Sequence, residues 1–448
     1  MRKILLSSVL LVTILLSACG QAAPQASDAP AASIGQATID ASRSISATAI
    51  AEMTREAQPT SSSPQNAQTA QTPPTSTPEP AVCHAVDMVP SANPTMAVLI
   101  PPVTKYDQTI GPTSASLTII EYGDFQCPSC AVLSLTLNQL AQAYPQDVRI
   151  VFRQFPQDSH NLAMLAAQAS EAAAIQGKFW QMHDLLYTSQ DQWSTKTPAD
   201  FEIWVKAKAL TLGLVGTQFE ADMDNPRIVK KVSDERDSIG PTGVVSGTPF
   251  LFLNNMPYAN GRTDLDTLKG IVELFGLPAR ALTCPPMTVD PKKQYTATIK
   301  TSKGDIVLEL YPEQAPVTVN NFIYMVDQGW YNGVPFHRVL PGYVAQTGDP
   351  SGTGMGGPGF QYGLETSPAL KFDKAGIVAM AHAQDVNSNG SQFFITFAAA
   401  PNLDGHFTVF GRVTQGMDVI QKLTPRDPSQ DTTQAAPDTI IEITITEK

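Results

Sequence analysis

The sequence is short of basic residues and of cysteine. Lysine and arginine number 29 against 41 aspartate and glutamate residues, which gives a formal net charge of −12. Binding to nucleic acid needs a basic surplus that neutralises phosphates, so we expect no nucleic-acid partner. Hydrophobic residues make up 42% of the 448 positions, enough for packed cores, and the length predicts two or three domains. The five cysteines are Cys19, Cys83, Cys127, Cys130 and Cys284.

The N-terminus has the layout of a secretory signal peptide. Arg2 and Lys3 precede an apolar run at 4–16 that is too short to span a bilayer. The run ends in LSAC at 16–19, which resembles the bacterial lipobox, whose cysteine becomes the lipidated first residue of the mature chain. The resemblance implies a lipoprotein anchored outside the cytoplasm through Cys19, where disulfides persist. Cleavage without lipidation is the alternative.

Aromatic residues are absent from residues 20–82, which are rich in alanine, serine, threonine, glutamine and proline. Such a composition cannot bury enough apolar surface to offset the entropy lost on ordering. We expect a disordered tether that holds the rest of the chain away from the membrane.

Two cysteines lie between a predicted strand and a predicted helix. Residues 117–122 (LTIIEY) indicate a buried strand, and leucines at helical spacing in 131–144 indicate a helix. Pro128 suits the first turn of that helix, since its missing N–H would have no partner there. Cys127 would then lie at the helix N-terminus, where the dipole and free N–H groups favour a thiolate.

A C-x-x-C pair is compatible with a metal site, a structural disulfide or a redox centre. A zinc site needs four ligands, and the sequence has no second C-x-x-C and no closely spaced histidine pair. A structural disulfide over two residues would constrain little of the unfolded chain. We therefore expect Cys127 and Cys130 to be a redox pair, with no metal and no cofactor.

More elements follow the cysteine pair: a strand at 148–154, an alanine-rich helical region at 161–239, a strand after Thr248-Pro249, a turn at 254–255 and a helix at 265–275. This order resembles the DsbA-like branch of the thioredoxin superfamily over about residues 100–280.

The resemblance implies roles for five residues. Cys127 would attack and Cys130 would resolve, while Thr248 and Pro249 match the loop whose cis-proline lies beside the pair and binds extended substrate. Glu121 matches the buried acid thought to carry the proton of the resolving thiol. A carboxylate at the surface end of a strand is the alternative for Glu121, although its apolar neighbours favour burial and a raised pKa.

A different pattern begins after the two prolines at 285–286. Residues 295–300 and 304–310 alternate like the strands of a hairpin, and 315–328 indicate a helix. Short strands and glycine-rich loops make up most of the remainder, which predicts a closed β-barrel.

Three stretches in this part carry a resemblance. They are FHRVLPGYVAQTGD at 336–349, NGSQFFI at 389–395 and LDGHFTVFG at 403–411. In this order they resemble cyclophilin, a peptidyl-prolyl isomerase, over about residues 294–448. The expected fold class is therefore multi-domain, with an α/β thioredoxin fold and helical insertion followed by a mostly β cyclophilin barrel.

The cyclophilin resemblance implies a catalytic group and a pocket. Amide resonance opposes rotation about X-Pro with a barrier of about 18–20 kcal/mol, and a cation that hydrogen-bonds the prolyl nitrogen weakens that resonance. Arg338 would be this cation, with Gln346 and Gln392 binding the substrate backbone. Core packing is the alternative for each apolar residue taken alone. The other substrate-binding residues implied are Phe336, His337, Tyr343, Val344, His382, Phe394, Leu403 and Phe407.

Cys83 and Cys284 remain after the lipidated cysteine and the redox pair are set aside. They lie at the two ends of the first domain, and domain termini are often close in space. We expect them to form a structural disulfide, because free thiols are disfavoured outside the cytoplasm.

The predicted organisation is a signal peptide at 1–19, a tether at 20–82, a DsbA-like domain at 83–284, a linker at 285–293 and a cyclophilin domain at 294–448. The expected function is extracytoplasmic folding catalysis on unfolded or partly folded secreted chains that contain X-Pro bonds and cysteines. A membrane redox partner is a further candidate. The alternatives are a non-catalytic chaperone or scaffold, and a dedicated disulfide reductase.

Overall fold

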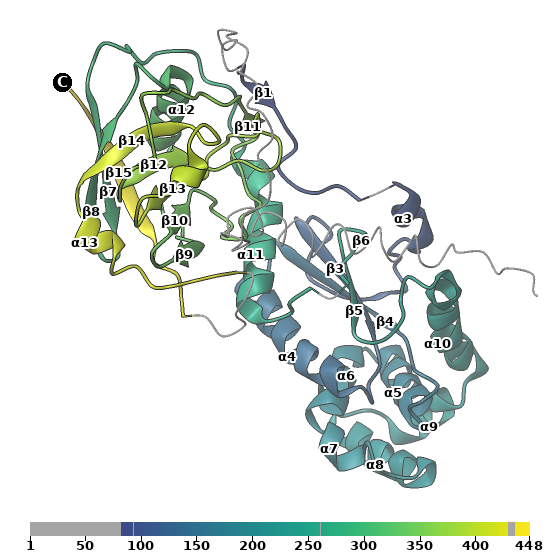
Figure 1. The fold of residues 1–448 in the computed structure, drawn as a ribbon. Coiled ribbons are helices and arrows are strands. Elements are labelled where there is room, and N and C mark those ends of the chain that lie inside the picture. The colour runs from purple at the N-terminus through teal and green to yellow at the C-terminus, as the bar shows by residue number, and fades with distance from the viewer. Residues whose placement is uncertain (1–81, 93, 260, 429–434) are drawn as a thin grey trace, which may run out of the picture.

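The computed structural model describes residues 82–92, 94–259, 261–428 and 435–448, and Figure 1 shows that they form two domains. The predicted signal peptide, Cys19 and almost all of the predicted tether lie outside the described residues. Among the helices of the described residues, none has the length and apolar character needed to cross a membrane.

The first domain is built on a mixed five-stranded sheet in the order β2-β4-β3-β5-β6. Its central strand β3 pairs in parallel with β4 and antiparallel with β5. All residues of β3 except Thr118 are buried, as its apolar and β-branched sequence predicts. The strands are β2 (Gln108–Ile110), β3 (Leu117–Gly123), β4 (Val148–Gln154), β5 (Phe250–Leu253) and β6 (Met256–Pro257).

Helices cover both faces of this sheet. On one face, leucines of α4 (Pro128–Ala143) pack with Leu268 and Ile271 of α11 (Leu265–Gly276). On the other face, Ile120 and Phe252 of the sheet pack with Ile239 at the end of α10. The rest of the predicted helical insertion forms its own core next to the cysteine pair, in which buried alanines of α5 let neighbouring helices approach closely. The insertion consists of α5 (Ala163–Ile175), α6 (Phe179–Thr188), α7 (Gln190–Trp193), α8 (Pro198–Thr211), α9 (Gly216–Met223), α10 (Pro226–Ile239) and the 3-10 turn η2 (Gly240–Thr242).

The second domain is a curled antiparallel sheet in the order β15-β7-β8-β14-β12-β13-β10-β9. Register shifts between β12 and β14, β14 and β8, and β15 and β7 act as bulges that increase its curl. The closed barrel expected from the sequence is a half-barrel, since β9 and the segments next to β15 are joined only by isolated bridges such as Val339 to Arg426. The strands are β7 (Tyr295–Thr301), β8 (Gly304–Leu310), β9 (Arg338–Leu340), β10 (Val344–Thr347), β12 (Ile377–Met380), β13 (Phe393–Thr396), β14 (Val409–Gln415) and β15 (Ile440–Glu447).

Two α-helices and a 3-10 turn complete this domain. Val319, Phe322 and Met325 of α12 are buried in the core, at the helical spacing that the sequence shows. The remaining elements are α12 (Pro316–Asp327), α13 (Met417–Ile420) and the 3-10 turn η4 (Pro401–Leu403).

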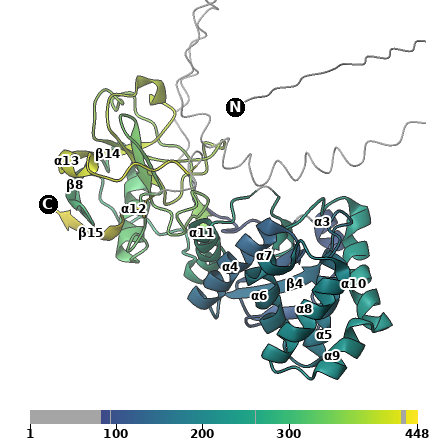
Figure 2. The same cartoon turned by 90° about the horizontal axis from the view of Figure 1, so that it is seen from below.

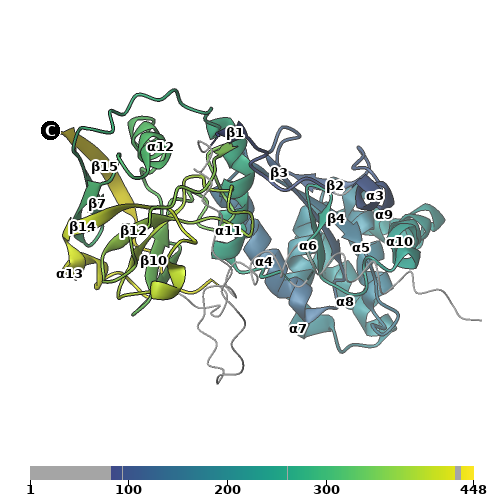
Figure 3. The same ribbon diagram turned by 45° about the horizontal axis from the view of Figure 1, so that its top comes forward.

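The segment 83–88, which we call the N-terminal strap, runs along the second domain. Its strand β1 (His84–Ala85) pairs antiparallel with β11 (Phe360–Gln361), and the Val86 N–H donates to the Gly359 carbonyl at 3.0 Å. Cys83 is bonded to Cys284, with their Cα atoms 5.9 Å apart. Figures 1 and 3 place β1 beside α11, where the two domains meet.

Helix α11 also packs between the domains, as Figure 2 shows. Leu274 at its end and Leu277 in the following turn η3 (Leu277–Arg280) are buried in the core of the second domain. Gly270 lies so near the loop before β11 that an added Cβ would come 3.1 Å from the Ser351 carbonyl oxygen. This close approach accounts for a glycine in the middle of a helix, where it costs about 1 kcal/mol.

The sequence predicts that 83–284 forms one domain, yet both ends of this range contact the second domain. Cys83, Met88, Leu282 and Cys284 pack against its core. No sequence pattern indicates the contact, because the paired strands are two residues long and lie far apart in the chain. The short helix α3 (Pro94–Leu99) follows the strap and leads into the first domain.

Replacing both Cys83 and Cys284 by serine should lower the free energy of unfolding. The cross-link joins residues 201 apart, for which the chain-entropy model sets an upper limit of about 5 kcal/mol. Calorimetry under non-reducing conditions should show a lower unfolding midpoint than for the wild type. The double variant Cys127→Ser/Cys130→Ser serves as control, and equal midpoints for the wild type and the Cys83/Cys284 variant would contradict the stabilising role.

Candidate active sites

The cysteine pair lies at the start of α4, next to the loop that carries Pro249. Cys127 is the N-cap residue of the helix, and Pro128 occupies its first turn. The Cys127 thiol contacts the Thr248 carbonyl oxygen at 3.3 Å, and the Thr248–Pro249 peptide bond is cis. Both cysteines are free, and Cys130 is fully buried behind Cys127. The predicted residues Cys127, Cys130, Thr248 and Pro249 are therefore brought together.

The two thiols have opposite pKa shifts. A hydrogen bond from the Cys130 thiol is the main cause that lowers the pKa of Cys127 to about 5, with further help from backbone N–H groups of the helix start. Burial raises the pKa of Cys130 far above its usual range, and the hydrogen bond to Cys127 adds to this. At neutral pH the pair therefore holds one thiolate, on Cys127, and one thiol, on Cys130.

Glu121 of β3 lies within the same region and is only 1% exposed. Burial is the main cause that raises its pKa to about 8, and the negative charge of Cys127 adds to the shift. Its Oε1 has no hydrogen-bond partner in the described residues. The carboxyl group is thus largely protonated at neutral pH, and when ionised it is close enough to Cys130 for its negative charge to raise the pKa of that thiol. The surface alternative considered for Glu121 is excluded by this burial.

Two glutamines that sequence reasoning missed hold the thiol site in place. Gln157 Nε2 donates to the Thr248 hydroxyl, and Gln190 Nε2 donates to the Cys127 carbonyl at 3.0 Å. Gln190 reaches the site from the helical insertion, 63 residues after Cys127. An isolated glutamine has no sequence pattern around it, so neither the contact of Gln157 nor that of Gln190 could be predicted.

The alkylation rate of Cys127 should follow the thiolate fraction. Because its pKa is lowered to about 5, the rate with iodoacetamide should rise through pH 5 and level off well below pH 8.5, the pKa of an ordinary cysteine. Mass spectrometry of the reduced protein between pH 3 and 9 measures this, since buried Cys130 should react slowly. A midpoint above pH 7 would contradict the assignment, and Cys127→Ser gives the background rate.

In the second domain, strand register aligns three predicted residues on one face of the sheet. Arg338 of β9 lies opposite Gln346 of β10, and Gln346 lies opposite Phe394 of β13. Directly opposed residues of neighbouring strands project to the same side. Arg338 is 8% exposed, its Nε has no hydrogen-bond partner in the described residues, and burial lowers its pKa from a very high ordinary value. It remains a cation at the edge of a cavity.

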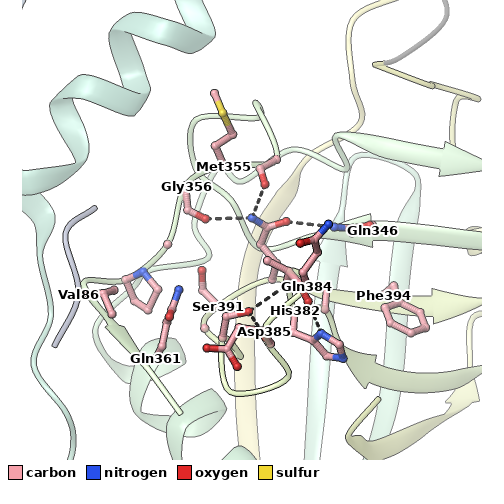
Figure 4. Close-up of a pocket in the computed structure, with 18 of the residues that line it drawn as sticks. Val86, Gln346, Met355, Gly356, Gln361, His382, Gln384, Asp385, Ser391 and Phe394 are labelled. Carbon is pink, nitrogen blue, oxygen red and sulfur yellow. Dashed lines mark hydrogen bonds between the residues drawn. The ribbon is translucent and has the colours of Figure 1, made fainter. Parts of the chain in front are cut away.

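Gln392 links this row to a glycine-rich loop, and Figure 4 labels Gln346 and Gly356 at the two ends of this link. Gln346 Nε2 donates to Gln392 Oε1 at 3.0 Å, and Gln392 Nε2 donates to the carbonyls of Gly354 and Gly356 at 2.9 and 3.0 Å. The loop is held by buried Asp349, whose Oδ2 accepts from the N–H groups of Gly354 and Gly356. Asp349 is the last residue of the 336–349 stretch, but the sequence does not predict that it anchors the glycine-rich loop.

An apolar pocket lies beside Arg338, at one end of a cavity of about 440 Å³. Phe394 and Phe407 meet edge to face with ring centroids 5.4 Å apart, and His382 stacks on Phe407 at 4.6 Å. The predicted residues that line the cavity are Arg338, Tyr343, Val344, Gln346, His382, Gln392, Phe394, Leu403 and Phe407.

Phe336 and His337 do not line this cavity, and their predicted contact with substrate is corrected. Their residues are 0% and 2% exposed, so a bound peptide cannot reach them. Phe336 belongs to the core of the second domain, and both ring nitrogens of His337 lack a hydrogen-bond partner in the described residues. Both residues precede Arg338 in the motif and are buried within the second domain.

Comparison with known proteins agrees with both parts of the chain. The family described as cyclophilin type peptidyl-prolyl cis-trans isomerase/CLD matches residues 296–445, and the thioredoxin family matches 103–273. Peptidyl-prolyl cis-trans isomerase-like 1 of Aspergillus fumigatus is 50% identical over 126 residues, 28% of this chain and 78% of the relative. Peptidyl-prolyl cis-trans isomerase of Helicobacter pylori is 47% identical over 133 residues, 29% of this chain and 81% of the relative. A crystal structure of a cyclophilin type isomerase from Cryptosporidium parvum matches with 35% identity and a TM-score of 0.32, covering 34% of this chain and 98% of that one.

The half-barrel and these relatives define a prolyl isomerase that carries a thioredoxin-like domain ahead of the isomerase domain. Within that class, the chain belongs to the cyclophilin-type peptidyl-prolyl cis-trans isomerase family.

Proposed function

We propose that this enzyme catalyses both prolyl isomerisation and thiol–disulfide exchange on the same secreted clients. The observation that carries the first activity is the row formed by Arg338, Gln346 and Phe394 beside the apolar pocket. The observation that carries the second is the thiolate of Cys127 next to the Pro249 loop. Without a catalyst, both reactions are slow steps in the folding of secreted proteins.

In the isomerase groove, the proline ring of a client occupies the pocket between Phe394 and Phe407. As the X-Pro bond twists, its nitrogen loses conjugation and becomes a better hydrogen-bond acceptor. An N–H of the Arg338 guanidinium donates to that nitrogen, and this bond is strongest in the twisted state, so it lowers the barrier. Gln346 orients the client backbone and is itself held by Gln392.

Arg338→Ala should reduce the isomerisation rate about a hundredfold, or about 3 kcal/mol, because one preorganised charged donor is lost. A protease-coupled assay on a proline tetrapeptide measures it. Arg412→Ala is the matched control, since Arg412 is an exposed arginine of the same domain that pairs with Glu309. Thiol exchange should stay intact in both variants. Full isomerase activity in Arg338→Ala would show that another group is catalytic.

In the oxidised enzyme, a client thiolate attacks the sulfur of Cys127, and Cys130 leaves with the bonding electron pair. Protonated Glu121 lies within the electrostatic reach of Cys130 and supplies its proton. A second client thiolate then attacks the mixed disulfide and expels Cys127 as a stable thiolate, so two client thiols are oxidised and the enzyme pair is reduced. The low pKa of Cys127 makes it a good leaving group, which favours transfer of the disulfide to the client over the reductase direction.

Cys127→Ser should abolish exchange with a reduced model protein, because the attacked sulfur is gone. Cys130→Ser should accumulate mixed disulfides with clients, since Cys127 still attacks client disulfides and nothing resolves the product. Non-reducing electrophoresis distinguishes the two outcomes, and Arg338→Ala provides the control. Full exchange activity in both cysteine variants would show that another group carries the reaction. No adduct from Cys130→Ser, together with no exchange by the wild type, would mean that the domain is a non-catalytic binding module.

The proposed location is outside the cytoplasm, on a lipid anchor at Cys19. Two observations support this location. Residues 1–19 have the pattern of a lipoprotein signal peptide, and the Cys83–Cys284 disulfide needs an oxidising compartment. Cells fed with labelled palmitate should incorporate it into the wild type and not into Cys19→Ala. Absence of label from the wild type would favour plain cleavage of the signal peptide.

A further inference from the structure

The far end of the isomerase cavity is closed by residues that belong to no part of the half-barrel. Val86, Asp87 and Met88 of the N-terminal strap line the cavity together with Gln361 and Asp385. Figure 4 shows Val86 and Gln361 at one end of the site and Phe394 at the other. A client held by its proline at Phe394 therefore extends toward the strap.

The strap is held firmly against this end of the cavity. Strand β1 pairs with β11, the Val86 N–H donates to the Gly359 carbonyl, and Met88 Sδ packs beside Gly359. Cys83 is covalently bound to Cys284, and the neighbouring Leu282 N–H donates to the Pro358 carbonyl at 2.8 Å. A wall fixed in this way meets a peptide without first losing conformational entropy.

The charges that line the cavity are unevenly distributed. Arg338 is the single Lys or Arg among the described residues that line it, and it lies in the row with Phe394, at the proline end. Asp87 and Asp385 are exposed, and within the part of the chain that the structure describes neither of them forms a salt bridge. The strap thus presents the Asp87 carboxylate to the cavity, with Asp385 lining the same cavity, and neither has a salt-bridge partner among the described residues.

We propose that the strap is the outer wall of the isomerase groove, and that Asp87, together with Asp385, selects clients with a lysine or arginine near the X-Pro bond. The inference rests on the proposed isomerase function and adds a substrate class to it. An extended peptide anchored at Phe394 runs past Gln346 and Gln392 and brings a neighbouring basic side chain to the two carboxylates. An acidic side chain at the same place is repelled.

Peptides with Lys, Ala or Glu at each of the two positions before and after the proline test this preference. On one side of the proline, the wild type should turn over the Lys peptide about two- to fivefold faster than the Ala peptide in kcat/KM, the range for an exposed ion pair. The Glu peptide should be slower than the Ala peptide, and both differences should shrink in high salt.

Variants locate the source of the preference. Asp87→Asn should bring the Lys-to-Glu ratio toward one, Asp87→Lys should invert it, and Asp385→Asn should reduce it. Asp327→Asn removes an exposed carboxylate of α12 that does not line the cavity, so it should leave the ratio as in the wild type.

A cross-link gives a second measurement that needs no variant. A Lys-containing peptide with a photoreactive group beside the lysine should attach to residues 84–88 of the wild type, as mapped by mass spectrometry. No charge preference in the wild type, a preference that survives Asp87→Lys, or attachment only elsewhere would overturn the inference. Failure of the wild type to turn over even the Ala peptide would instead refute the proposed isomerase function.

Discussion

The disulfide bond between Cys83 and Cys284 fixes the N-terminal strap, and the contact between the two domains depends on this strap. Both cysteines belong by sequence to the first domain, yet both pack against the core of the second. Around this bond, the strap pairs with β11 and Leu282 donates to the Pro358 carbonyl. The loop that supplies the carbonyls for Gln392 is therefore supported from its outer side by the first domain and from its inner side by Asp349. The segment that leads into the thioredoxin-like domain thus lines the cavity of the isomerase domain, so the two domains are joined by more than a tether.

Burial tunes both sites, with opposite consequences for the charges involved. At the thiol site, burial raises the pKa of Cys130 so that it stays neutral, while the hydrogen bond from the Cys130 thiol, with help from helix N–H groups, lowers the pKa of Cys127 so that it keeps its charge. Burial, and next the negative charge of Cys127, raises the pKa of Glu121 to about 8, so its carboxyl group largely keeps its proton at neutral pH. In the groove, Arg338 also loses solvation, but its ordinary pKa is so high that it stays charged. The thiolate of Cys127 and the guanidinium of Arg338 are thus both partly withdrawn from water, which strengthens their electrostatic interactions with nearby groups.

Sequence reasoning was most successful where function depends on local patterns. The strand at 117–123 with the C-x-x-C helix start, and the hairpin at 295–310, lie where the periodicity predicts them. The arrangement of Arg338, Gln346 and Phe394 depends on strand register, which the motifs imply only through family resemblance. Phe336 and His337 were misassigned because membership of a motif does not say which face of a chain is buried. The strap and Gln190 could not be predicted, since both act through contacts between distant segments that leave no periodic signal.

The pairing of β1 with β11 also constrains the order in which the chain can mature during synthesis. The strap leaves the ribosome before either domain, but its partner strand is among the later parts of the chain to be made. Cys83 therefore has to remain unpaired until Cys284 emerges, and β1 stays exposed until residues 360–361 have been translated. Non-local contacts of this kind form late, because the loop they close is long. Residues 83–284 are thus synthesised in full before the strand that pairs with β1, so the contact that places the strap along the cavity is among the last that the chain can form.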